Sequence, residues 1–326
     1  MNELSKKALI GTGAAALAMG ALTGGAFVLS SALLHLALDR KMPKSLEKRR
    51  DVLTGESGEY AHLFAQLEPA ARQLRHSGCV RVELKARDGT PLVGHWYENP
   101  YARRVVVAMH GWRSGWDQDF GLIAPFFHEM GCSVLYAEQR GQNGSGGAHI
   151  TFGLLERYDC LDWVEWVSRH TLPYLPVYLA GISMGATTVL LAAGQEMPPC
   201  VRGVIADCGF TSPHDIWRHV AERNLHLKYD LHQGWVEWLC RRRLHMGMNN
   251  ASTLTAMENC RVPVLFVHGS EDSFVPVEMT YENYKACAAP KELLIVPGAG
   301  HGMSYLMETD RYQKTLKSFW KTCEQH

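Results

Sequence analysis

The sequence predicts an α/β fold: a mostly parallel, doubly wound sheet with a small helical cap, preceded by an N-terminal transmembrane helix. Short apolar runs alternate with segments of helical period, one long segment interrupts that alternation, and an uncharged stretch opens the 326-residue chain. The division that follows is a membrane anchor at 1–41, a linker and surface helix at 42–79, and a main domain at 80–326 with a cap insertion at about 211–258.

Composition excludes several classes of protein. Hydrophobic residues make up 46% of the chain, and 33 basic side chains balance 33 acidic ones. This combination excludes a disordered or collagen-like chain, and it supplies no long-range attraction to nucleic acid. The nine cysteines include no CxxC pair, which favours buried thiols over a disulfide framework.

The opening apolar segment predicts an uncleaved single-pass anchor in the cell membrane. Residues 8–38 contain no Asp, Glu, Lys or Arg, and as a helix they exceed the roughly 30 Å of a bilayer's hydrocarbon core. A cleaved secretory signal led by Lys6 and Lys7 is the alternative, although its apolar part would be only about 7 to 15 residues long. Six basic residues after the segment favour a cytoplasmic main domain, whereas the Lys-led start favours the opposite side.

Eight strands are expected in the main domain. Alternating residues at 80–86 and 91–98, joined by an Asp-Gly turn, predict an antiparallel pair. Six nearly continuous apolar runs predict buried parallel strands, at 104–109, 132–137, 177–181, 201–207, 262–269 and 292–298. The clearest helix between them is 154–170, with Glu156, Asp162 and Glu165 expected to face away from the core. Such sheets bind ligands at the carboxyl ends of their strands.

A candidate nucleophile, Ser183, lies in the sequence Gly-Ile-Ser-Met-Gly at 181–185. This motif follows an apolar run and precedes a helical segment, the context of a nucleophile elbow, in which a serine sits on a sharp turn between strand and helix. Glycines two residues to either side avoid steric clashes across such a turn. An ordinary glycine-rich turn is the alternative for the motif taken alone.

A serine nucleophile needs a general base and an acid that orients it. Asp272 follows the run at 262–269, and His301 lies between glycines after the run at 292–298, so the order Ser183, Asp272, His301 fits three converging strand ends. Glu271 and Asp207 are rival acids. Asp272 is preferred because it has the better loop position.

Acyl transfer also requires hydrogen-bond donors for the developing oxyanion. The backbone N–H of Met184, directly after the serine, is one expected donor. The second is the N–H of Trp112, in the loop after 104–109, where Gly111 permits a tight turn. His110, at the start of that loop, is expected to be structural.

Several motifs in this order resemble those of the α/β-hydrolase superfamily over 80–320, about three quarters of the chain. They are HGW, EQRGQNGSGG, GISMG, ADCGF, the G-x-x-D-x-x-V-P run and GAGHG. In particular they resemble bacterial membrane-anchored serine hydrolases related to the serine-aminopeptidase-like and prolyl-oligopeptidase-like branches. The resemblance implies a serine hydrolase that acts on an ester, thioester or amide through an acyl-enzyme. The chain departs from the usual pattern at Glu138, where the family carries Asp.

The function expected is cleavage of a carboxylic ester or thioester, with a small acyl compound as substrate and the membrane as the other partner. An aminopeptidase or dipeptidase and a non-catalytic membrane-tethered binding module are the alternatives. No HExxH motif or Cys/His cluster is present, so neither a metal nor another cofactor is expected.

The helical cap is predicted because one connection between strands is much longer than a crossover requires. More than fifty residues separate the runs at 201–207 and 262–269, whereas a crossover needs only about a dozen. Arginines 241 to 243 in this segment form either a solvated face or a patch that attracts an anionic acyl carrier. Five aromatic residues are candidates for pocket walls, with packing between cap and body as the alternative: Trp112, Trp116, Phe210, Trp217 and Trp235.

Overall fold

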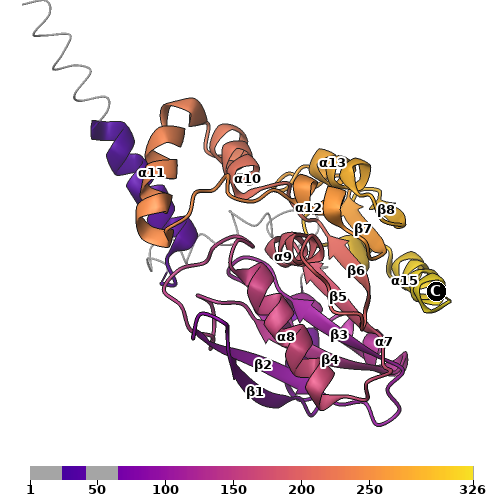
Figure 1. Cartoon of the computed structure of the whole chain (residues 1–326). Helices are drawn as coiled ribbons and strands as arrows, with labels where there is room; N and C mark the ends of the chain where they lie inside the picture. The colour runs from indigo at the N-terminus through magenta and orange to yellow at the C-terminus, as the bar shows by residue number, and fades with distance from the viewer. Residues whose placement is uncertain (1–23, 42–64, 326) are drawn as a thin grey trace, which may run out of the picture.

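The structure is a computed structural model that describes residues 24–41 and 65–325 (Figure 1). One eight-stranded sheet runs through it in the order β1-β2-β4-β3-β5-β6-β7-β8. β2 is antiparallel to β1 and β4, and the other neighbours are parallel. The predicted mostly parallel, doubly wound sheet and all eight predicted strands are confirmed. The strands are β1 (Val80–Lys85), β2 (Pro91–Tyr97), β3 (Arg104–Met109), β4 (Cys132–Glu138), β5 (Val177–Ile182), β6 (Val201–Asp207), β7 (Val264–Gly269) and β8 (Lys291–Val296).

Helices cover both faces of the sheet, as right-handed crossovers require. One face carries α8 (Glu156–His170), α9 (Met184–Ala193), α12 (Thr253–Asn259) and α13 (Val277–Ala286). The other carries α5 (Leu67–Arg75), α6 (Trp116–Phe120), α7 (Ala124–Glu129), α14 (Ser304–Met307) and α15 (Thr309–Glu324).

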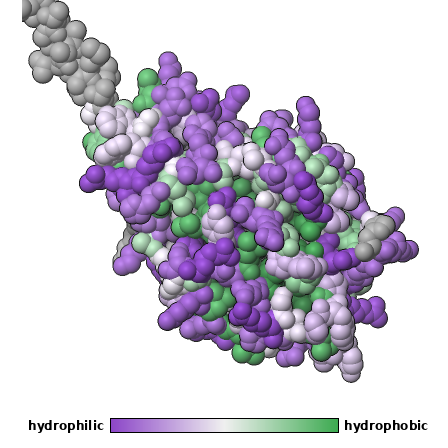
Figure 2. Space-filling view, in the orientation of Figure 1, coloured by the Kyte–Doolittle hydropathy of each residue, from purple (hydrophilic) through white to green (hydrophobic). Residues whose placement is uncertain are grey.

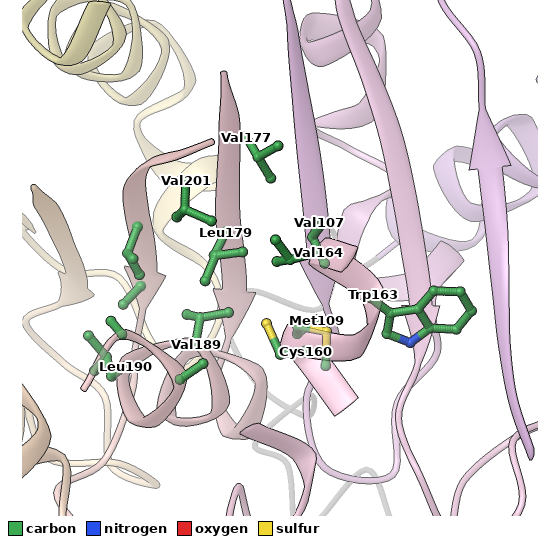
Figure 3. Packing of buried hydrophobic residues seen from close by; sticks show 14 of the residues in the cluster. Val107, Met109, Cys160, Trp163, Val164, Val177, Leu179, Val189, Leu190 and Val201 are labelled. Carbon is green, nitrogen blue, oxygen red and sulfur yellow. The ribbon is translucent and has the colours of Figure 1, made fainter. Parts of the chain in front are cut away.

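Two hydrophobic cores lie on the two faces of the sheet because successive strand residues point to opposite sides. In β3, Val107 and Met109 enter the core under α8 and α9, whereas Val106 and Ala108 enter the other core. Figure 3 shows Val107 and Met109 packed beside Val164 of α8. Every residue of β3 is buried, which explains its continuous apolar sequence.

The start of α8 differs from the expectation. Glu156 was predicted to face away from the core, and this is wrong because its side chain is fully buried. Its carboxylate accepts hydrogen bonds from Thr151 N at 2.7 Å and Gly153 N at 2.8 Å, so it ties down the preceding loop. A buried carboxylate needs such donors, and periodicity alone does not reveal them.

The segment after β6 forms a small helical layer over the loops that follow β5, β6 and β7. It contains α10 (Pro213–His219), a π-helical turn (Val220–Asn224), a 3-10 turn (Tyr229–Leu231) and α11 (Gln233–Leu244). A third hydrophobic cluster joins this layer to the residues around the carboxyl ends of the strands. α12 lies instead against α9 and α13 beside the sheet.

Part of the predicted membrane segment packs against the protein. Residues 24–38 form a helix beside α11 (Figure 1), and Leu34 and Leu38 on it are fully buried. Within 24–41 and 65–325, no helix is long and apolar enough to cross a bilayer. Residues 1–23 of the predicted anchor and 42–64 of the predicted linker lie outside the described residues.

The surface of the protein is mostly hydrophilic, in contrast to helix 24–38. Hydrophilic side chains cover most of the face visible in Figure 2. Helix 24–38 is an exception on its outer side, where Val28 is 65% exposed and Leu29 38%.

Candidate active site

Ser183 occupies the sharp turn between β5 and α9. Its φ of 56° and ψ of −119° lie in a region that residues other than glycine rarely adopt. Hydrogen bonds hold the turn on both sides: Ser183 N donates to Asp207 O at 2.8 Å, and Thr187 N donates to Ser183 O at 3.1 Å. These hydrogen bonds hold the backbone of Ser183 in its strained conformation. The serine hydroxyl therefore lies at the carboxyl end of the sheet.

The glycines of the motif are required by close backbone contacts. A Cβ at Gly185 would lie 1.9 Å from Met109 O, and a Cβ at Gly181 would lie 2.2 Å from Gly185 O. Both distances are far below van der Waals contact, so no side chain fits at either position. The sequence-based prediction that these glycines avoid steric clashes across the turn agrees with these distances.

The structure brings the three predicted site residues into one hydrogen-bonded array. His301 Nε2 lies 2.8 Å from Ser183 Oγ, and His301 Nδ1 lies 2.7 Å from Asp272 Oδ2. Because a carboxylate only accepts, Nδ1 carries the proton, which leaves Nε2 to accept from the serine hydroxyl. The three residues come from the loops after β5, β7 and β8.

The Asp272 carboxylate is buried and has four hydrogen-bond donors. Oδ1 accepts from Phe274 N and Val275 N, each at 2.9 Å. Oδ2 accepts from His301 and, at 3.1 Å, from His268 Nε2. Burial alone would raise the pKa of Asp272, but the two neighbouring imidazoles lower it well below its ordinary value. The group is therefore an anion under all ordinary conditions.

The rival acids take other positions. Glu271 is exposed to solvent. Asp207 is buried, and its Oδ1 accepts a hydrogen bond from Ser304 Oγ at 3.0 Å. Burial raises the pKa of Asp207. Of these acids, Asp272 is the one hydrogen-bonded to His301.

His301 is the titratable group that decides the state of the array. Burial would lower the pKa of His301, but the charge and hydrogen bond of Asp272 raise it well above 6.5. Cys208, at the end of β6, lies against the same imidazole, and burial raises the pKa of this thiol to about 11, so it is uncharged near neutral pH. Phe274 contacts the imidazole edge-on, with ring centroids 5.1 Å apart.

His268 was not singled out from the sequence. It is fully buried at the end of β7, where Nε2 donates to Asp272 Oδ2 and to Val275 O at 2.9 Å. Its Nδ1 lies 2.7 Å from Thr280 Oγ1, which therefore donates to it. In the sequence, His268 is only a histidine at the end of the apolar run 262–269, and nothing there indicates its contact with Asp272.

In the loop after β3, the backbone donors on either side of Trp112 are bonded within the described residues. Gly111 N donates to Asp119 Oδ2 at 2.6 Å, and Arg113 N donates to Gln142. Between them, Trp112 N has no acceptor among the described residues, and the same holds for Met184 N. A Cβ at Gly111 would lie 3.4 Å from the Ser183 Cβ, so this loop passes close to the serine.

His110 has the structural role that was expected from the sequence, because it is hydrogen-bonded to the loops after β3 and β4. It is fully buried, its Nδ1 donates to Gly111 O at 2.7 Å, and its Nε2 accepts from Gln139 N at 3.1 Å. These bonds connect the loops after β3 and β4. Burial lowers the pKa of His110, so the ring is neutral.

Two cavities meet at Ser183. The mixed cavity, of about 180 Å³, is lined by Asp119, His301 and Tyr312 among others. The apolar cavity, of about 150 Å³, lies under α10 and α11. Of the five aromatic candidates, three line the apolar cavity and two do not: Trp112, Phe210 and Trp217 line it, whereas Trp116 stacks on His95 and Trp235 contacts Phe27.

The arginine run contacts neighbouring side chains. Arg241 pairs with Glu237 at 2.8 Å, Arg242 lies over the Trp238 ring, and Arg243 lies near helix 24–38. Neither cavity at Ser183 is lined by any of the three.

In the described part of the chain, one group of three residues could offer ligands to a metal ion: Cys208, Asp272 and His301. Two of them, Asp272 and His301, are already hydrogen-bonded to each other. The arrangement is therefore that of an acid–base array, with a thiol beside it.

Fold and site define the class of protein: a serine hydrolase of the α/β-hydrolase type. The model of the prolyl oligopeptidase family matches residues 118–326, and the chain belongs to that family.

Two uncharacterized bacterial proteins are similar to this chain over most of its length. YqkD, an uncharacterized protein of Bacillus subtilis, is 25% identical over 310 residues, which cover 93% of this chain and 95% of YqkD. YfhR, an uncharacterized protein of Escherichia coli O157:H7, is 25% identical over 68% of this chain and 72% of its own length.

Two solved structures show the same fold. An esterase of Pyrococcus furiosus superposes with a TM-score of 0.63 and 20% identity, over 77% of this chain and 93% of the esterase. The acylaminoacyl peptidase of Pyrococcus horikoshii superposes with a TM-score of 0.55 and 18% identity, over 74% of this chain and 41% of the peptidase.

Proposed function

We propose that the protein hydrolyses a carboxylic ester or thioester through an acyl-enzyme on Ser183. The observation that carries the proposal is the position of His301, which is hydrogen-bonded to the Ser183 hydroxyl through one nitrogen and to the Asp272 carboxylate through the other. This is the geometry in which a histidine accepts a proton from a nucleophile while a carboxylate stabilises the imidazolium that forms.

The reaction proceeds in two halves. Ser183 Oγ attacks the carbonyl carbon as its proton passes to His301 Nε2, and the tetrahedral intermediate collapses when the leaving alcohol or thiol takes that proton. Water then gives a proton to His301 and attacks the acyl-enzyme. The carboxylic acid leaves as the proton returns to Ser183 Oγ.

Backbone donors stabilise the oxyanion in both halves. The N–H groups of Trp112 and Met184 are proposed for this role because neither has another acceptor in the described residues and both lie beside Ser183. A donor of this kind typically contributes about 3 to 4 kcal/mol to transition-state stabilisation.

The apolar cavity supports the ester over the amide. Its walls are aliphatic and aromatic side chains, and it opens on Ser183, which suits a hydrocarbon acyl group. A fold neighbour named as an esterase is consistent with this substrate.

A peptidase is the second candidate, and Asp119 favours it. This carboxylate lines the mixed cavity with Ser183 and could hold a substrate amine. However, Asp119 already accepts from Gly111 N and, at 2.5 Å, from Ser114 Oγ, so it serves the loop after β3. The ester therefore remains the preferred substrate.

A parallel substrate panel separates these candidates. The full-length chain is assayed with p-nitrophenyl esters, an acyl thioester and aminoacyl p-nitroanilides, with Ser183→Ala as the blank. Ester or thioester turnover that exceeds anilide turnover and disappears in Ser183→Ala supports the proposal. Turnover confined to the anilides and lost in Ser183→Ala supports the peptidase, and no turnover by a folded protein supports the binding module.

We also propose that the N-terminus attaches the protein to the cell membrane. Residues 8–23 contain no charged side chain, and Val28 and Leu29 expose apolar surface on the helix that follows. Alkaline carbonate washing of cell membranes tests this. The full chain should stay in the pellet, and its release into the supernatant would overturn the proposal. Protease protection of sealed vesicles then reports which side carries the main domain.

A further inference from the structure

The C-terminal end of helix 24–38 is bonded to the loops that surround the site. Trp112 Nε1 donates to Ala37 O at 2.9 Å, and Ile150 N donates to Leu38 O at 2.7 Å. The last carbonyls of a helix lack partners within the helix, so these donors satisfy them. The helix is thereby fixed beside the residue proposed to bind the oxyanion.

The middle of the helix is bonded to α11 and the residue before it. Ser30 Oγ lies 3.0 Å from His232 Nδ1, and Arg243 Nη2 donates to His35 Nε2 at 2.9 Å. Figure 1 shows the indigo helix side by side with α11. Polar contacts in its middle and at its C-terminal end therefore hold an otherwise apolar helix in one position.

Between these contacts, the helix forms one wall of the apolar cavity. Four of its residues line that cavity: Leu33, Leu34, Leu36 and Ala37. Trp217 and Val236 line it from α10 and α11, and Ser183 lies at its end. The volume of about 150 Å³ equals that of a dry protein cavity able to hold benzene, so about six carbon atoms fit.

We infer that helix 24–38 completes the acyl-chain site and sets the length of acyl chain that the protein accepts. The inference rests on the proposed function. The bound ligand is an unbranched acyl group of about six carbons, with its chain against the helix and its carbonyl carbon at Ser183. The helix lies outside residues 118–326, so this wall is not part of the matched family region.

Replacement of each of two alanines on this helix by phenylalanine tests the inference. Ala37→Phe fills the cavity, whereas Ala32→Phe adds the same ring on the exposed side. The measurement is kcat/KM of the full-length chain for p-nitrophenyl acetate, hexanoate and dodecanoate. The hexanoate-to-acetate ratio should fall at least about 10-fold in Ala37→Phe and stay unchanged in Ala32→Phe.

A second pair covers the case in which Ala37→Phe does not fold. Leu33→Ala enlarges the cavity, and Val28→Ala shortens a side chain that is 65% exposed. The preferred chain length should increase in Leu33→Ala alone. Unchanged profiles in Leu33→Ala and in a folded Ala37→Phe would overturn the inference.

Labelling of Ser183 by a small fluorophosphonate separates this failure from failure of the proposed function. If all four variants are labelled as the parent is but share its chain-length profile, the helix does not form the acyl site and the hydrolase proposal stands. If the folded parent itself is not labelled, the proposed function fails first, and the inference fails with it.

Discussion

His268 Nε2 lies 3.1 Å from Asp272 Oδ2, the same oxygen that accepts the hydrogen bond from His301. The carboxylate is therefore held between two imidazoles, one exposed in part to the site and one fully buried. Val275 O and Thr280 Oγ1 fix the buried ring. We interpret His268 as a positioning residue that keeps Asp272 aligned with His301.

Removal of this donor is expected to lower kcat. A hydrogen bond to a charged group contributes about 1.5 to 3 kcal/mol, so His268→Leu should reduce kcat about 10-fold or more. KM should stay near the parent value because His268 does not line either cavity. His268→Gln retains an N–H donor and should recover part of the loss. Equal kcat values in the Leu variant and the parent would refute the positioning role.

The glycine at 185 is expected to be irreplaceable. Gly185→Ala would place a Cβ 1.9 Å from Met109 O, and overpacking of this kind costs about 1 to 3 kcal/mol or more. Thermal unfolding should therefore shift to lower temperature. Gly234→Ala is the matched control, because this glycine lies in α11 with no atom within 4 Å of the new Cβ, and it should stabilise the protein by roughly 0.5 to 1 kcal/mol. A Gly185→Ala protein as stable as the parent would contradict the close packing of the turn.

The rate of serine acylation should rise with pH. Only neutral His301 accepts the Ser183 proton, and the pKa of His301 lies well above 6.5, so activity should fall on the acid side with a midpoint above 6.5. Asp272→Asn removes the charge that raises this pKa, while burial still lowers it. The acid limb should then move to lower pH, and the maximal rate should drop roughly 10,000-fold.

The second-order rate of fluorophosphonate inactivation, measured between about pH 5 and 9, provides this profile for both proteins. A midpoint that stays in place in Asp272→Asn would show that Asp272 does not control His301.

The sheet and the array of Ser183, Asp272 and His301 were predictable because their signals are local. Buried strands are continuous apolar runs, and each of the three residues follows one of them. The order along the chain then places all three at the carboxyl edge of one sheet.

Two features escaped prediction because they depend on how separate elements of the fold pack together. His268 is hydrogen-bonded to Thr280 because α13 packs on β7. The spacing of residues in the sequence does not indicate this contact. The apolar sequence of 24–38 is equally compatible with a bilayer and with a protein cavity. Only its few polar residues distinguish the two, since Ser30 and His35 bond to the α11 region.

The central claim is that Ser183 is a nucleophile activated by His301, and intact mass after exposure to a fluorophosphonate tests it most directly. The full-length parent should gain one phosphonyl adduct, with loss of fluoride, whereas Ser183→Ala should gain none and His301→Ala should react far more slowly. An unmodified but folded parent, or an adduct that persists in Ser183→Ala, would contradict the account.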